Sequence, residues 1–293
     1  MKYLEELLFL QSLPKVGKAT IYKKYIQLLQ MSNNINNLID MLAVDPSTAS
    51  AIKGKIANQM EALTTRPDIS VITVLDEEYP ASLYDLGNKK PLALFIRGNG
   101  SLLSKPGIAV IGTRSPSLHT KKIEPGLVKN IIEFTGDSII SGLAAGCDAI
   151  AHEASILYQG KTIAVLPGGI DKIYPPAHTD LARRIVSSGG CLVSEYGLDS
   201  SAFKYSFIER DSVIAALSHT IIAVECSKKS GTMATVKAGT DMRRKIGCYI
   251  PKDMTLGDFS GNEYMQKELS AVGIKDTLSL QRSLTAPNYS LVT

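Results

Sequence analysis

The stretch GIAVIGTR at residues 107–114 decides the fold. Its first five residues are apolar and rich in β-branched side chains, which predicts a short buried strand. The strand ends in Gly112, Thr113 and Arg114, and a polar turn and a helical pattern follow. At such a strand end, backbone N–H groups and the helix dipole attract anions, and arginine adds a planar fork that fits phosphate. We therefore predict an anion site at this point.

The same pattern of an apolar strand followed by small residues recurs along the chain. Further strands are expected at residues 138–140, 162–166, 191–193 and 220–224. Continuously apolar strands are typical of a parallel sheet that is covered on both faces. Helical patterns alternate with them at about residues 119–134, 147–159, 178–189, 208–218 and 232–245. The alternation predicts an α/β fold with a doubly wound, mostly parallel, Rossmann-like sheet.

The ends of these strands carry glycines, hydroxyl groups and amides, and we call this edge of the sheet the ledge. Ligands of open α/β sheets bind outside the carboxyl ends of the strands, so the ledge is expected to bind phosphate. The residues expected to bind it are Gly112, Thr113, Arg114, Ser141, Gly142, Gly168, Gly169, Lys172, Phe207, Arg210, Ser230, Gly231 and Thr232. Phe207 has two open interpretations, since it could stack a base or pack in the core. For Lys172, as for Lys228 and Lys229, contact with a ligand and plain solvation both stay open.

Composition limits the class of protein. The 293 residues are 44% apolar and carry a net charge of only +4, so nucleic-acid binding would need a local patch. The four cysteines form no CxxC pair and lie in or beside apolar runs, so buried, reduced thiols are expected. The sequence shows neither a signal peptide nor an apolar stretch of membrane-spanning length, and we expect a cytoplasmic protein.

The N-terminal part has a different pattern. Residues 1–65 show helical spacing of apolar residues, which predicts a small helical domain of the SAM or helix–hairpin–helix kind. Its turn at residues 13–18 contains Lys15 and Lys18. This turn could hold a nucleic-acid backbone, or it could be a solvated turn in a plain helical bundle, and both interpretations stay open.

The Rossmann-like domain is expected to cover residues 66–275. Its first strands, at residues 69–75 and 91–96, should extend the main sheet or form a small lobe beside it. A last helix is expected at residues 264–272. The polar tail at residues 276–293 is expected to be loosely ordered.

Other kinds of chemistry fit less well. A dinucleotide fold needs GxGxxG after its first strand and an acid after the second, and this chain has neither. Asp148 and His152 lie four residues apart on one helix face and could orient a base, but a structural pair is commoner, so we expect no enzymatic activity. His119, His152, His178 and His219 lack ligand spacing, so neither a metal nor a cofactor is expected.

At these residues the chain resembles the DprA (Smf) family, the DNA-processing proteins of bacterial transformation. The resemblance covers nearly the whole chain. Its most specific motifs are AVIGTR at 109–114, SGLAAGCD at 141–148, TIAVLPGGIDKIYP at 162–175 and GGCLVSEY at 189–196. The resemblance implies an extended Rossmann domain behind a helical domain, and a homodimer that binds single-stranded DNA and loads the RecA recombinase onto it. It implies no catalytic reaction.

The chain departs from the family where cations are expected. Ala145 stands where the family usually has Lys or Arg. The family's FPxRNR becomes FIERDS, so Arg210 is kept while Asp211 and Ser212 replace Asn and Arg. The loss of two cations predicts either weaker DNA binding or a different anionic ligand. The alternative function is a sensor of a nucleotide or nucleotide derivative on the same scaffold.

Overall fold

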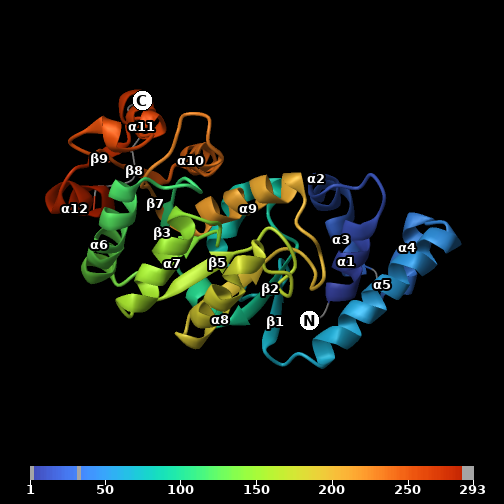
Figure 1. The fold of residues 1–293 in the computed structure, drawn as a ribbon. Helices are drawn as coiled ribbons and strands as arrows, with labels where there is room; N and C mark the ends of the chain where they lie inside the picture. The colour runs from blue at the N-terminus through green and yellow to red at the C-terminus, as the bar shows by residue number, and fades with distance from the viewer. Residues whose placement is uncertain (1–2, 32–33, 286–293) are drawn as a thin grey trace.

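The structure is a computed structural model, and it describes residues 3–31 and 34–285. A nine-stranded sheet forms the centre of this part of the chain (Figure 1). Its strands are β1 (Ile69–Thr73), β2 (Ala93–Gly98), β3 (Gly107–Ile111), β4 (Ile139–Ser141), β5 (Thr162–Val165), β6 (Cys191–Ser194), β7 (Ser218–Ala223), β8 (Lys245–Tyr249) and β9 (Val272–Ile274). Their order is β1-β2-β6-β5-β4-β3-β7-β8-β9. The strands from β6 to β9 pair in parallel, and β1 and β2 add an antiparallel edge.

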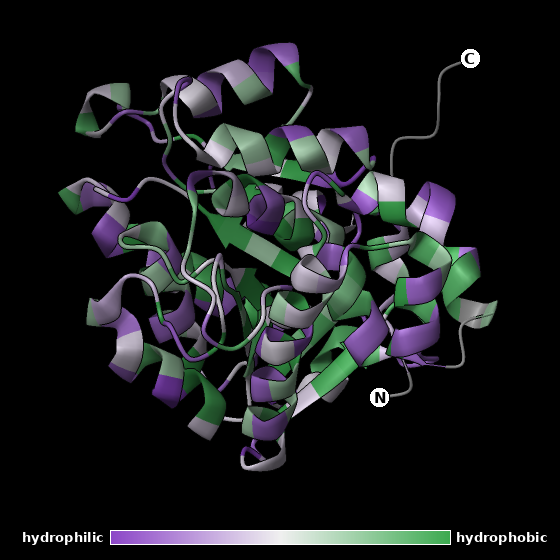
Figure 2. Cartoon of the chain, turned by 90° about the vertical axis from the view of Figure 1, so that its right-hand side faces the viewer, coloured by the Kyte–Doolittle hydropathy of each residue, from purple (hydrophilic) through white to green (hydrophobic). Residues whose placement is uncertain are grey.

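Helices cover both faces of this sheet. They are α6 (Leu118–Thr135), α7 (Cys147–Leu157), α8 (Thr179–Ser187), α9 (Lys204–Ala216), α10 (Thr232–Asp241), α11 (Ser260–Glu268) and α12 (Thr277–Thr285). Ile108 and Val110 of β3 pack with α6, α7 and α12, whereas Ala109 and Ile111 belong to the core that includes α9 and α10. Successive strand residues point to opposite faces, so the two groups of helices lie on opposite sides. Figure 2 shows the apolar strands between these more polar helices.

The order in which the chain adds strands to the sheet reverses at β3, while the strands on both sides of β3 stay parallel to it. From β3 the chain proceeds through β4 and β5 to β6, and then returns to β7 on the other side of β3. The carboxyl ends of β3 and β7 therefore flank a topological switch point, where open α/β sheets bind their ligands. Short 3-10 helices lie outside this region, at η2 (Ala81–Lys89), η3 (Gly100–Ser104), η4 (Pro176–His178) and η5 (Met254–Leu256).

The N-terminal helices form a separate layer beside the β1 side of the sheet (Figure 1). They are α1 (Leu4–Ser12), a continuous helical run of α2 (Lys18–Thr20), η1 (Ile21–Tyr25) and α3 (Ile26–Met31), α4 (Ile35–Leu42) and α5 (Pro46–Thr64). The fully buried side chains of Leu4, Leu7, Phe9 and Leu10 fill the core of this layer. Asp45 begins α5, because its carboxylate accepts the N–H groups of Ser47 and Thr48.

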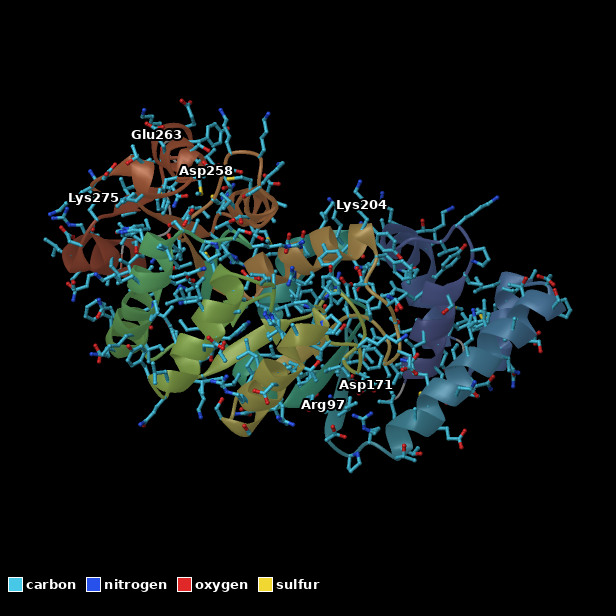
Figure 3. All side chains as sticks on the ribbon, viewed as in Figure 1. Arg97, Asp171, Lys204, Asp258, Glu263 and Lys275 are labelled. Carbon is cyan, nitrogen blue, oxygen red and sulfur yellow. The ribbon has the colours of Figure 1, made fainter. Side chains whose placement is uncertain are left out.

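Ion pairs fix the helical layer to the sheet. The ammonium group of Lys18 inserts between Glu195, just after β6, and Glu209 of α9 (3.0 Å). On the other side of the junction, Asp171 accepts from Arg66 (3.0 Å) and from Arg97 of β2 (2.5 Å), and Figure 3 shows Arg97 and Asp171 together there. The loop that follows β5 is thus tied to the linker between the two parts of the chain.

The structure confirms the predicted α/β fold class, resolves one open alternative and corrects two details. Strands β1 and β2 extend the main sheet, which is the first of the two arrangements expected for them. The last helix expected at residues 264–272 is instead α11 at Ser260–Glu268, followed by strand β9. Residues 277–285 of the expected polar tail form helix α12, because Leu280 and Leu284 are buried against the α6 face. The rest of that tail, residues 286–293, lies outside the described residues.

Candidate nucleic-acid interface

A hollow of about 480 Å³ lies at the switch point, between the end of β3, the start of α7, helix α9 and the start of α10. We call it the ledge pocket. Its lining includes Gly112, Thr113, Arg114, Asp148, Phe207, Arg210, Asp211, Ser230, Gly231 and Thr232. The structure thus brings the expected residues after β3 together with those on α9 and at the start of α10.

Arg114 stands at the mouth of the ledge pocket. Its side chain is exposed and makes no ion pair with any residue in the described ranges. Its guanidinium carbon lies 5.6 Å from the centre of the Phe207 ring, which itself contacts Tyr174 edge to face at 5.4 Å. A cation–π contact at this distance orients the guanidinium and leaves its N–H groups available to an anion.

Gly112 and Thr113 hold this arginine in place. A side chain at Gly112 would collide with Cys147, so glycine is needed for α7 to approach β3. The Thr113 N–H donates to the Glu225 carbonyl (2.7 Å), and the Thr113 carbonyl accepts from the Cys147 N–H (3.1 Å). Both residues therefore position Arg114, and the Thr113 amide is already in use.

The start of α10 supplies further donors. Ser230, Gly231 and Thr232 all line the pocket, and the N-cap Gly231 provides no side-chain cap. The N–H groups of Met233 and Ala234 donate to the carbonyls of Ser230 (3.1 Å) and Gly231 (2.8 Å). Among the described residues no hydrogen bond occupies the N–H groups of Gly231 and Thr232, so these two and the positive end of the helix dipole are available to an anion. The expected phosphate-binding role of these three residues fits their position.

Ser141 and Gly142, by contrast, are buried and their polar groups already have protein partners, so the structure does not support the predicted phosphate contacts. The Ser141 hydroxyl is fully buried and donates to the Val110 carbonyl (2.7 Å). The Gly142 N–H donates to Oδ2 of Asp148 (3.1 Å), and the Ala144 N–H points to the same oxygen (3.4 Å). The Asp148 carboxylate thus occupies the amides that a phosphate would need.

Gly168 and Gly169 have a packing role in the structure. Both are buried, and the Gly169 N–H donates to the Ser200 carbonyl (2.7 Å). A side chain at Gly169 would collide with the Leu198 carbonyl. These glycines are needed for the close approach of the 197–202 segment, which explains the sequence pattern without a phosphate.

Arg210 lies in the wall of the ledge pocket with only 5% of its surface exposed. Its Nη1 donates to the carbonyls of Gly142 and Val165 (3.2 Å to the latter), and its Nε donates to Asp211 (2.9 Å). Arg210 therefore braces two loops, where a direct phosphate contact was expected. Burial raises the pKa of Asp211 to about 6, although Arg210 favours the charged form.

Asp148 and His152 do not form a pair. Asp148 caps the loop after β4, as described above, whereas His152 Nδ1 shares a hydrogen bond with the Thr162 hydroxyl (2.7 Å). Burial lowers the pKa of His152 to about 3, so the ring is neutral. Both side chains have structural contacts that account for their presence.

The four cysteines are buried and free, as expected.

The remaining lysines are spread over the surface. Lys172 is exposed on the loop after β5, outside the lining of the ledge pocket. Lys228 is exposed just before α10 and lies over the ring of Tyr264 at 4.2 Å. Lys18 is committed to Glu195 and Glu209, so the idea that it contacts a nucleic-acid backbone is wrong.

Sequence analysis missed Tyr174 as a site residue. It is 44% exposed, packs edge to face against Phe207 and lines a small hollow of about 90 Å³ that shares Arg114 and Phe207 with the ledge pocket. The sequence did contain a signal for Tyr174, since this residue belongs to the IYP segment at the end of the loop after β5.

No helix in the described part of the chain is long and apolar enough to cross a membrane.

Comparison with known proteins identifies relatives of this chain. The model of the family "DNA recombination-mediator protein A" matches residues 70–283. Protein Smf of Synechocystis is 35% identical over 60% of this chain and 44% of its own length, and the DNA processing protein DprA of Bacillus subtilis is 32% identical over 69% of both chains. The chain thus spans less than half the length of that Smf protein.

Two solved structures are similar over most of the chain. The DprA structure from Streptococcus pneumoniae has a TM-score of 0.71 and 25% identity, and covers 92% of this chain and 98% of its own. The Helicobacter pylori DNA processing protein A, whose structure is described as showing a unique single-stranded DNA binding mode, has a TM-score of 0.64 and 27% identity over 74% of this chain and 95% of its own. With the family match and the ledge pocket at the switch point, these similarities show that the chain belongs to the DprA/Smf family of DNA recombination-mediator proteins.

Proposed function

We propose that this protein binds single-stranded DNA at the ledge pocket without sequence preference. The observation that carries the proposal is the position of Arg114, exposed and unpaired in the described structure, between the Phe207 ring and the start of α10. A phosphate would lie between the guanidinium and the N–H groups of Gly231 and Thr232 at the start of α10. An adjacent base would stack on Phe207 or Tyr174.

The site favours single strands over duplexes. Stacking on an aromatic ring requires a free base face, and the bases of a duplex are stacked on one another. Contacts to phosphate and to base faces carry little sequence information. Affinity should fall with salt, with a log–log slope of roughly −0.7 for each phosphate contact.

The proposal extends to partners. Family membership supports a role in which the protein loads RecA onto single-stranded DNA during transformation and works as a homodimer. We further propose that binding proceeds without catalysis. The Asp148 carboxylate and the His152 ring support this, because each has a separate structural partner. These steps are tested by following RecA assembly on an oligonucleotide with and without the protein, and by measuring the mass of the protein in solution.

One observation favours the alternative, a nucleotide sensor. The ledge pocket has the volume of a small-molecule site and lies at the switch point, where related sheets bind nucleotides. The Asp211 carboxylate in its lining would also accept the amino group of a base.

Two measurements on the same protein separate the candidates. The first is a gel shift with a single-stranded oligonucleotide and with its duplex, and the second is a thermal-shift panel of free nucleotides. Single-strand binding that weakens with salt supports the proposal. Preference for the duplex, or affinity that does not change with salt, refutes it. A large thermal shift with one nucleotide and no oligonucleotide binding supports the sensor instead.

A further inference from the structure

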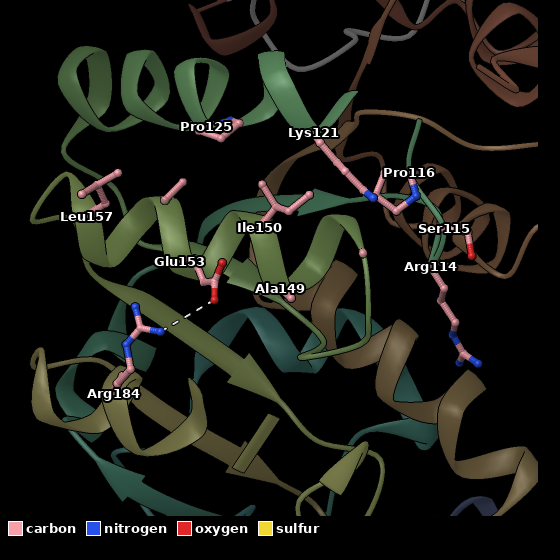
Figure 4. Close-up of a pocket in the computed structure, with 12 residues that line it drawn as sticks. Arg114, Ser115, Pro116, Lys121, Pro125, Ala149, Ile150, Glu153, Leu157 and Arg184 are labelled. Carbon is pink, nitrogen blue, oxygen red and sulfur yellow. Dashed lines mark ion pairs between the residues drawn. The ribbon is translucent and has the colours of Figure 1, made fainter. Parts of the chain in front are cut away.

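A second hollow lies between α6 and α7, next to the ledge pocket (Figure 4). It has a volume of about 860 Å³, and we call it the α6–α7 groove. Its apolar lining includes Pro125, Ile150 and Leu157, and Leu157 is 68% exposed. Exposed apolar surface bordered by charged side chains marks an interaction site. The groove therefore suits a ligand with both apolar and charged parts.

Arg114 connects the two hollows, because it lines both of them. Ser115 and Pro116, the next residues in the chain, continue the wall of the groove. The backbone of Thr113 is hydrogen-bonded to both Glu225 and Cys147, which fixes the loop from which Arg114 projects. A chain-like ligand that leaves the ledge pocket past Arg114 thus enters the groove directly.

Cations stand at both ends of the groove. Figure 4 shows Arg114 and Lys121 at one end and Arg184 of α8 at the other, with Ile150 between them. The carboxylate in the lining belongs to Glu153, whose Oε1 is 3.7 Å from Nη1 of Arg184. Both of these side chains are about half exposed (56% and 45%), and an exposed pair of this kind is weak. Arg184 can therefore exchange Glu153 for a phosphate.

We propose that the α6–α7 groove is a second subsite for single-stranded DNA, through which the strand continues from the ledge pocket. Base faces lie on Ile150 and Leu157, and phosphates meet Lys121 and Arg184. Single-stranded DNA alternates apolar base faces with phosphates, which matches an apolar floor with cations at both ends. The inference rests on the proposed function of the ledge pocket. It adds that affinity depends on strand length, because a short strand fills the ledge pocket alone.

The test compares two oligothymidylates, of about 6 and about 20 nucleotides, chosen around the usual site sizes of single-strand binding proteins. Fluorescence anisotropy is measured for the wild type and for the double variant Lys121→Ala/Arg184→Ala. The matched control is Lys122→Ala/Arg183→Ala, which removes two neighbouring exposed cations that do not line the groove. A third variant, Glu153→Gln, removes the competing carboxylate.

The groove variant should bind the long strand about tenfold more weakly and the short strand unchanged, since two exposed contacts together amount to roughly one factor of ten. Its salt slope with the long strand should be shallower by roughly 1.4, which is about 0.7 for each lost contact. Glu153→Gln should bind the long strand about two- to threefold more tightly, because it loses a repulsive charge. The control should resemble the wild type.

Two results overturn this inference while the ledge pocket stands. One is unchanged long-strand affinity in the groove variant, which would assign the groove to another occupant such as an acidic protein segment. The other is an equal loss in the control, which would indicate general charge attraction. Failure of the wild type to bind either strand refutes the proposed function itself, and the inference with it.

Discussion

Replacing Arg114 tests the centre of the proposed site. The side chain is exposed and makes no ion pair among the residues in the described ranges, so its substitution removes a ligand contact and, within the protein, the exposed contact with the Phe207 ring at 5.6 Å. A charge-assisted hydrogen bond contributes about 1.5–3 kcal/mol. Arg114→Ala should therefore weaken single-strand binding by about tenfold to a hundredfold, because 1.4 kcal/mol is a factor of ten.

Two further variants make this result specific. Arg114→Lys should recover part of the affinity, since a point charge lacks both the bidentate fork and the planar stacking surface of arginine. Arg183→Ala removes an arginine whose side chain is 79% exposed on α8, outside both hollows, and should bind as the wild type does.

The assay is an anisotropy titration with one oligonucleotide at fixed salt, together with a melting curve for each variant. The free energy of unfolding should change by no more than about 0.5 kcal/mol, as for other surface substitutions. If folded Arg114→Ala binds as tightly as the wild type, phosphate does not meet this residue, and the ledge pocket is not the site.

Three other substitutions test the surroundings of the site. The pKa of Asp211 is raised from 3.8 to about 6, so the folded protein holds its proton more tightly than the unfolded chain and loses stability as pH rises from about 4 to about 6. Asp211→Asn should flatten this pH dependence in urea titrations and strengthen oligonucleotide binding at pH 7, and an unchanged profile would contradict the assignment. Lys18→Ala leaves Glu195 buried without its cation and should cost about 3–5 kcal/mol in chemical denaturation; a loss under about 1 kcal/mol would show that the junction does not need this pair. His152→Ala removes a fully buried ring that is hydrogen-bonded to Thr162, and it should lower the free energy of unfolding by about 2–3 kcal/mol. Neither this variant nor the wild type should turn over DNA or nucleotides in a product assay. Turnover by the wild type that disappears in the variant would show that the protein is an enzyme.

The sheet was predictable from sequence because each of its central strands is an apolar run that no helical spacing explains. Residues 107–111 are completely buried in β3, as their composition indicates. Helix α12 was missed although Leu280 and Leu284 have helical spacing, because one turn of apolar residues in a polar segment is a weak signal.

The donors of the ledge were harder to predict than its position. Sequence shows that Gly142 and Gly169 follow strands, but not where their N–H groups point. The Gly142 N–H is taken by a carboxylate six residues later, and the Gly169 N–H by a carbonyl thirty-one residues later. Partners that depend on tertiary packing have no local pattern, so glycine-rich strand ends overstate the number of amides open to a ligand.

The same occupied donors explain why affinity should depend on few residues in this chain. Asp148 fills the loop amides after β4, and Arg210 faces Asp211 and two carbonyls, so neither the loop nor that arginine offers a free positive charge. What remains at the ledge pocket is Arg114 and the start of α10. A site with one exposed cation binds a single phosphate weakly, and in a polyanion the gain from each further contact adds to the first. The cations of the α6–α7 groove would then supply the affinity that the family position at Ala145 no longer provides.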